Sequence, residues 1–208
     1  MTTPGVPTFD IRAAIARLTG AAAWDTRDDP VDARRGLLLS ASATYAPESL
    51  GSDFRFTKYV GQAYAFQSWR QVVLASAARL GVAWGFGGQE LVPSERFFAG
   101  GARTVRGVPE DSLGEQDFFG PVGGQALLVL NQEARVPIYK WLRGVGFVDA
   151  GNVFAQPSGI RLNELSGSIG FGLRLSTPFA LLRADYGKVV WGPGTRSSRW
   201  VVGIGQAF

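Results

Sequence analysis

The feature that most constrains this chain is an alternation, with a period of two, of large apolar residues with small or polar ones. In 168–175, Ile169, Phe171 and Leu173 alternate with serine, glycine and arginine. Successive side chains of a β-strand point to opposite faces, so this pattern predicts strands. The chain contains about nine such segments, near residues 14–25, 37–46, 55–66, 71–86, 125–136, 142–150, 166–176, 179–187 and 198–208. The sequence therefore predicts an all-β fold.

The length and the two faces of these segments indicate where they fold. Most are about 9–12 residues long, close to the 9–11 residues that a tilted strand needs to cross a bilayer. The less apolar face carries Gly, Ala, Ser and single arginines, which suits a lumen better than a solvated sheet surface. Aromatic residues lie near segment ends, as in interfacial girdles: Trp24, Tyr45, Trp69, Trp84, Trp141, Trp191, Trp200 and Phe208. We expect a transmembrane antiparallel β-barrel, and a soluble ligand-binding β-barrel remains the alternative.

Composition excludes several classes of function. The 208 residues include no cysteine and no histidine, so disulfides, thiol nucleophiles and the commonest general base are absent. The net charge of +4 is spread over scattered arginines, which does not predict a nucleic-acid partner. No uninterrupted apolar stretch is long enough for a membrane helix, and residues 1–20 lack the order of a secretory signal. We expect neither catalysis nor a cofactor nor a bound metal.

One long segment, residues 87–124, breaks the alternation. It is rich in glycine and contains the adjacent pair Phe97-Phe98. Loops longer than about 12–15 residues are usually functional or disordered, and the two phenylalanines argue against disorder. We expect this loop to pack against the rest of the protein, and the small residues on the inner strand faces leave room for it.

Several motifs in this loop and around it occur in a known order. They read RFFAGG at 96–101, TVRG at 104–107, NQEARVPI at 131–138, FVDAGNV at 147–153 and IGQAF at 204–208, with DTRDDP at 25–30 and RG at 35–36 upstream. Residues 17–208 therefore resemble the C-terminal barrel of the Omp85 superfamily, which includes BamA-type and TamA-type assembly factors and the bacterial surface antigen D15. Residues 1–16 form a poorly defined N-terminal segment. One departure is Val108, which stands where the family has an aromatic residue.

The resemblance implies a specific role for the long loop. In this family the loop folds back into the barrel, and its arginine meets acidic groups on the inner wall. An arginine can donate two parallel hydrogen bonds to a carboxylate, so we predict that Arg106 pairs with Glu133, Asp149 or both. The alternative is a solvated loop arginine. The predicted contact between loop and lumen, which we call the latch, comprises Val105, Arg106, Gly107, Glu133 and Asp149.

Alternation places only one of the two carboxylates. Glu133 shares a strand face with Asn131 and Arg135, so it points into the lumen. Asp149 is luminal by its family position, but Val145 and Phe147 share its parity, so alternation alone leaves the orientation of that strand open.

The C-terminal segment resembles the family's targeting strand. Its apolar residues are predicted to share one face and to end in the signal that the outer-membrane assembly machinery reads; the alternative is an ordinary apolar strand end. Glycine weakens strand pairing, so the same strand is expected to form one side of a weak lateral seam. The residues of this signal and seam are Trp200, Val202, Gly203, Ile204, Gly205 and Phe208.

The resemblance implies a barrel that helps to insert or export proteins at the bacterial outer membrane, without enzymatic activity. The implied partners are outer-membrane lipids, client β-barrel or secreted proteins, and the outer-membrane assembly machinery. The alternatives are the membrane anchor of a secretion transporter or of a patatin-type lipase. About nine strands are expected where the family uses sixteen, so we expect the C-terminal half of a larger protein or a reduced relative.

Overall fold

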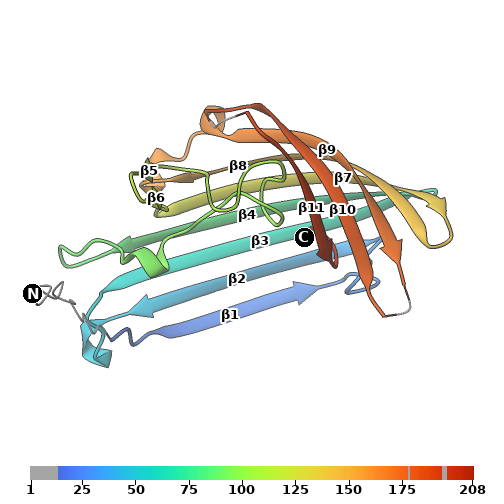
Figure 1. Ribbon diagram of the computed structural model, residues 1–208. Coiled ribbons are helices and arrows are strands. Elements are labelled where there is room, and N and C mark those ends of the chain that lie inside the picture. Colours follow the sequence, from blue (N-terminus) through green and yellow to red (C-terminus); the bar gives the residue numbers. More distant parts are fainter. Residues whose placement is uncertain (1–13, 178, 194–195) are drawn as a thin grey trace, which may run out of the picture.

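The computed structural model describes residues 14–177, 179–193 and 196–208, and most of the predicted segment 1–16 lies outside them. Nine strands form one antiparallel sheet in the order β1-β2-β3-β4-β7-β8-β9-β10-β11 (Figure 1). They are β1 (Leu18–Asp25), β2 (Gly36–Ala46), β3 (Phe56–Trp69), β4 (Val72–Gly85), β7 (Ala126–Tyr139), β8 (Leu142–Phe154), β9 (Ser166–Ser176), β10 (Leu181–Trp191) and β11 (Ser198–Ile204). Each predicted segment therefore corresponds to one strand, and the all-β prediction is confirmed.

Neighbours in the chain are neighbours in the sheet, except that the long loop separates β4 from β7. Within this loop a short hairpin pairs β5 (Gln116–Asp117) with β6 (Gly120–Pro121). Four 3-10 turns complete the regular structure: η1 (Glu48–Leu50), η2 (Pro93–Glu95), η3 (Pro157–Gly159) and η4 (Leu162–Glu164). None of the helical segments in the described residues is long and apolar enough to cross a membrane.

The two ends of the sheet differ in their connections. At one end, two-residue turns at 70–71 and 140–141 join β3 to β4 and β7 to β8. We call this the short-turn end; the turn at 26–35 between β1 and β2 also lies there, because the strands are antiparallel. The long loop and the connection at 155–165 lie at the opposite end.

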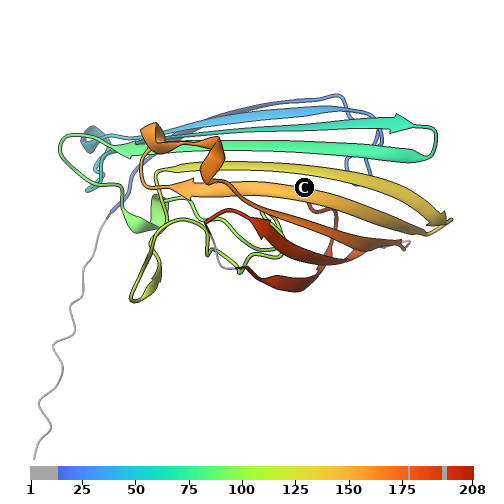
Figure 2. The same ribbon diagram turned by 90° about the horizontal axis from the view of Figure 1, so that it is seen from above.

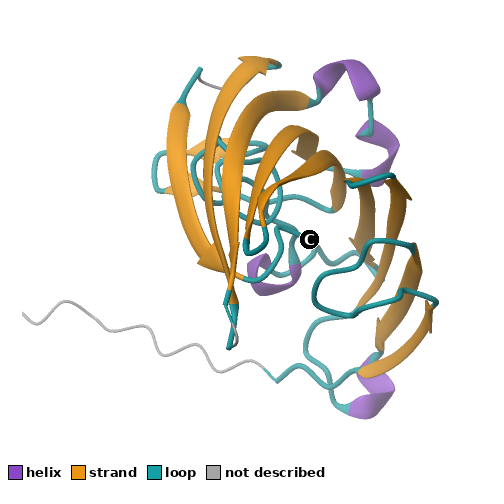
Figure 3. Ribbon diagram, turned by 90° about the vertical axis from the view of Figure 1, so that its right-hand side faces the viewer, coloured by secondary structure: helices purple, strands orange, loops and turns teal. Residues whose placement is uncertain are grey.

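The sheet curls, so that it has an inner and an outer face (Figure 3). The inner face carries the buried Glu133, Asp149 and Asp185. The outer face carries apolar side chains that are at least 38% exposed, among them Leu39, Leu74, Leu80, Leu130, Val148, Ile169, Leu173, Leu182 and Val202. An exposed apolar surface of this kind is what a lipid-facing barrel wall presents.

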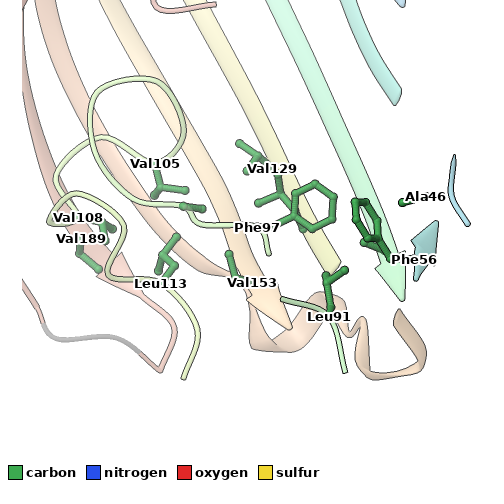
Figure 4. Close-up of a cluster of buried hydrophobic side chains, with 13 residues drawn as sticks. Ala46, Phe56, Leu91, Phe97, Val105, Val108, Leu113, Val129, Val153 and Val189 are labelled. Carbon is green, nitrogen blue, oxygen red and sulfur yellow. The ribbon is translucent and has the colours of Figure 1, made fainter. Parts of the chain in front are cut away.

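The long loop lies within the curve of the sheet (Figure 2). Its base is closed by two backbone hydrogen bonds between Phe97 and Gly124, of 2.8 and 3.0 Å. From there it packs into a buried apolar cluster with the inner face (Figure 4), which includes Phe56, Leu91, Phe97, Val105, Val108, Leu113, Val129, Val153 and Val189. Val108 is 6% exposed, so an aliphatic side chain fills the space where the family has an aromatic one.

The prediction that the last strand runs to the C-terminus is wrong. β11 ends at Ile204, and Gly205 follows with a φ of +87°, a backbone conformation that favours glycine. The chain then turns inward, and the Phe208 ring stacks on Tyr64 at 6.3 Å. Phe208 therefore does not share the outer face with Ile204, and it does not belong to an outer aromatic girdle.

Candidate functional site

The latch centres on Arg106, which the long loop carries into the inner face. Its Nε and Nη2 atoms each donate to one oxygen of Asp149, both at 2.7 Å, and its Nη1 atom donates to Glu133. The backbone N–H of Arg106 also donates to Asp149, at 3.1 Å. The Arg106 side chain is 1% exposed and both carboxylates are fully buried. The structure thus brings Arg106 together with both carboxylates that the sequence singled out.

Phe147 explains why alternation left the orientation of β8 open. The guanidinium carbon of Arg106 lies 3.5 Å from the centroid of the Phe147 ring, within the range of a cation–π contact. Phe147 and Asp149 therefore both face inward, because one supports the face of the guanidinium and the other accepts its hydrogen bonds. An apolar residue on a polar strand face was the ambiguous feature, and it is part of the latch.

The latch belongs to a larger buried cluster of charges on β7, β8, β9 and β10. Arg174 donates to Asp185 at 2.6 Å and to Glu133 at 3.2 Å. Asp185 also lies 3.5 Å from Arg106, a pairing that the sequence prediction did not include. Asp185 lies on the strand face opposite Leu182 and Ala184, so alternation predicts that it faces inward, and this partner could have been found from the sequence. Buried charges are costly unless they are paired, and here each carboxylate contacts at least one guanidinium.

Polar side chains of the wall also hold the backbone of the loop. Asn131 Nδ2 donates to the carbonyl oxygen of Thr104 at 2.6 Å and to Asp149 at 2.8 Å. Arg183 Nη2 donates to the carbonyl oxygen of Ala102 at 3.2 Å. Ser197 Oγ donates to the carbonyl oxygen of Gly107 at 2.7 Å. Sequence reasoning missed these contacts, because a backbone acceptor leaves no signal in a residue pattern.

Two glycines let the loop backbone lie directly on β10. A Cβ atom at Gly187 would lie 2.8 Å from the carbonyl carbon of Arg106, and one at Gly107 would lie 2.7 Å from that of Gly187. Gly107 also has a φ of +91°. Since neither backbone can yield to a side chain, these positions require glycine for the observed approach. Val105, next to Arg106, is fully buried and anchors the loop in the apolar cluster.

The residues predicted for the C-terminal signal and seam fall into two groups. Trp200, Val202 and Ile204 face outward and are 66, 81 and 75% exposed. Gly203 faces inward, where a Cβ atom would lie 3.0 Å from Arg183 Nε. Gly205 and Phe208 lie beyond the strand, as described above. The structure therefore does not bring these residues together on one face.

On the outer face Trp200 contacts one aromatic ring of the neighbouring strand β10 and one of β9, the next strand in the sheet. Its ring centroid lies 5.2 Å from that of Tyr186 and 6.2 Å from that of Phe171. Aromatic pairs at these distances contribute to stability beyond their buried area. This cluster is the main side-chain contact that holds β11 on the outer face.

The inner face binds the long loop, and its charged groups contact one another. Among the residues that the structure describes, no group of three or more Asp and Glu side chains is placed to hold a metal ion. The carboxylates of the latch are occupied by guanidinium groups. The arrangement can fix a loop inside a curved sheet.

Comparison with known proteins matches residues 11–208 to the Omp85 superfamily domain. The chain is 26% identical over 178 residues to a SAM50-like protein of Schizosaccharomyces pombe, covering 74% of this chain and 38% of that protein. It is 30% identical over 105 residues to the chloroplastic outer envelope protein 39 of Arabidopsis thaliana, covering 47% of this chain and 27% of that protein.

The fold is similar to that of BamA from Haemophilus ducreyi, in a crystal structure lacking POTRA domains 1–3. The TM-score is 0.76 at 19% identity, over 90% of this chain and 42% of that chain. The chain thus spans less than half the length of each of these three proteins. The matched domain covers nearly all of its residues, and on that ground the chain belongs to the Omp85 superfamily.

Proposed function

We propose that this chain forms the membrane-embedded barrel region of a factor that inserts or translocates proteins at the bacterial outer membrane. Its family is one of assembly factors rather than enzymes. Members of the family lie in outer membranes of bacteria, mitochondria or chloroplasts. The bacterial assignment is the finer part of the proposal, and so are the partners: outer-membrane lipids, client β-barrel or secreted proteins, and the assembly machinery.

The observation that carries this proposal is the fully paired Arg106. Residues Val105, Arg106 and Gly107 dock by apolar packing, ion pairs and backbone contact in turn. We propose that this latch keeps the long loop inside the barrel while client strands pair at another part of the sheet. Such a loop supports the wall without needing a cofactor.

We further propose that β11 is the edge strand at which client strands pair. An incompletely paired edge strand templates the addition of another strand. Within the described residues β11 pairs only with β10, over 7 residues, whereas β7 has 14 residues and pairs on both sides. The exposed apolar residues of β11 face outward, as lipid-facing side chains do, and a client strand would pair with the free backbone edge of β11.

Reconstitution tests the assembly function. The purified protein is placed in lipid vesicles, and the folding rate of a urea-unfolded β-barrel protein into these vesicles is measured. We expect faster folding than into empty vesicles, and a loss of that gain in Arg106→Ala. The matched control is Arg103→Ala, since Arg103 is an exposed arginine of the same loop. Equal rates in empty and loaded vesicles would contradict the proposal.

The C-terminal signal needs a separate test, because Phe208 also packs inside. Deletion of Phe208 should impair insertion into the outer membrane if the residue is part of the signal. Tyr64→Leu removes the ring on which Phe208 stacks but keeps the C-terminal residue. Impaired insertion in the deletion alone supports a signal, whereas equal impairment in both variants assigns Phe208 a packing role only.

A further inference from the structure

A second site lies at the short-turn end of the inner face, away from the latch. A cavity of about 490 Å³ opens there between the turns at 26–35, 70–71 and 140–141. Its wall contains four cationic side chains and no carboxylate: Arg34, Arg135, Lys140 and Arg143. A cavity with one sign of charge favours a ligand of the opposite sign.

Two carboxylates of the turn at 26–35, Asp32 and Asp28, are committed to other contacts. Asp32 forms an ion pair with Arg143 and accepts a hydrogen bond from Gln206 at 3.1 Å. Asp28 accepts from the backbone N–H groups of Arg34 and Arg35, at 2.8 and 3.1 Å, and these bonds lower the pKa of its carboxyl. These carboxylates hold the turn in place, and of the two only Asp32 forms an ion pair with a residue of the cavity wall.

Arg135 gives the site an unpaired donor. Its Nε atom donates to Glu133 at 3.0 Å, but Glu133 also forms ion pairs with Arg106 and Arg174. The Arg135 side chain is only 1% exposed, and both of its Nη atoms are buried without a hydrogen-bond partner among the described residues. A buried donor left unpaired is costly, so an acceptor brought by a ligand would relieve this cost.

The charge balance of the inner face points to the same place. Four buried arginines, at 106, 135, 174 and 183, face three buried carboxylates, at 133, 149 and 185. The count leaves one positive charge uncompensated. Arg135 is the member of this cluster that lines the cavity, and neither of its Nη atoms has a hydrogen-bond partner among the described residues.

We propose that this cavity binds a phosphate group. A phosphate monoester carries about 1.5 to 2 negative charges at pH 7 and three acceptor oxygens, which suits several cations better than a single carboxylate does. Arginine matches its geometry with two parallel donors, and lysine adds a point charge. Arg34 and Lys140 make no side-chain hydrogen bond or ion pair with any described residue, so both can turn toward the ligand.

The phosphate can come from a lipid headgroup or from solution. Beside the cavity the exposed rings of Tyr139 and Trp141 contact each other at 5.6 Å. Exposed aromatic residues mark the level of lipid headgroups in barrel proteins, which favours a lipid source.

Calorimetric titration of the purified protein in zwitterionic detergent with inorganic phosphate, at constant ionic strength, tests the site. We expect saturable binding of one phosphate per chain. The double variant R34Q/K140Q should weaken it at least about tenfold, or about 1.4 kcal/mol. The control Arg161→Gln removes one charge at the opposite end of the sheet and should bind like the wild type. Circular dichroism verifies that each variant is folded.

A second arm identifies the source. Nanodiscs of phosphatidylcholine, with and without phosphatidic acid, are compared for phosphate binding by the same protein. Weaker phosphate binding in the presence of phosphatidic acid supports a lipid headgroup, and unchanged binding supports free phosphate. The proposal is overturned if neither phosphate nor phosphatidic acid binds saturably, or if R34Q/K140Q binds as tightly as the wild type.

Discussion

The latch and the C-terminal edge are built in opposite ways. The latch is shielded from solvent, because Arg106 is 1% exposed and contacts Glu133 and Asp149, which are fully buried. Among the described residues the edge strand β11 has a single neighbour, and its outward side chains Val202 and Ile204 are 81 and 75% exposed. One region is held by paired charges and direct backbone contact, the other by a short ladder and one aromatic cluster.

This difference teaches which part of the molecule can change its partner. Removing one member of a buried ion pair costs about 3–5 kcal/mol, so any arrangement in which the latch is open is much less stable than the closed one. An edge strand already presents unpaired N–H and C=O groups. We therefore expect the loop to stay docked under conditions in which β11 opens and closes.

The largest expected effect comes from Arg106→Ala. The change leaves Glu133 and Asp149 without their shared cation, so we expect a loss of about 3–5 kcal/mol in the docking of the loop. Limited proteolysis of the folded protein should then cleave within residues 87–124. Arg103→Ala, which alters an exposed arginine of the same loop, should leave the cleavage pattern unchanged. Equal protection in both variants would show that the ion pairs do not hold the loop.

Gly187→Ala tests the backbone contact without touching a charge. Its Cβ atom would lie 2.8 Å from backbone atoms of Arg106 and Gly107, so the loop must shift, at a cost of about 1–3 kcal/mol. Urea unfolding in detergent measures the loss. The control is Gly146→Ala on β8, where a Cβ atom would meet nothing within 4 Å. If both variants unfold alike, the close approach of the loop to β10 is not a constraint.

The two regions also differ in how far the sequence predicts them. Glu133 could be placed from alternation, because it carries a charge on one face of a regular strand, and Arg106 from the resemblance of the motif around it to the family. The contact with Phe147 could not be predicted, since an aromatic residue on a polar face has no unique meaning. The tail after Gly205 was misassigned because Ile204 and Phe208 have the same parity, and alternation does not report where a strand stops. A glycine with positive φ ends it.

Trp200→Ala weakens the edge and should leave the latch unchanged. It removes two aromatic contacts, with Tyr186 and Phe171, worth about 1–2 kcal/mol together. Hydrogen exchange measured by mass spectrometry should become faster in β11, while β7 stays protected. Phe118→Ala is a suitable control, since Phe118 is 96% exposed at the tip of the hairpin in the long loop. Faster exchange in both strands would mean that the two regions are coupled.

The smallest expected effect concerns the tail that follows the edge. Tyr64→Leu removes the ring on which Phe208 stacks at 6.3 Å, and one aromatic pair contributes about 0.5–1.5 kcal/mol. Carboxypeptidase should then release Phe208 about 2- to 10-fold faster. Tyr59→Leu removes an aromatic pair on the outer face of the same strand and should not change this rate. Because the tail is attached directly to β11, unchanged hydrogen exchange in β11 of Tyr64→Leu would show that the edge opens independently of the tail, whereas faster exchange there would show that the buried tail restrains the edge.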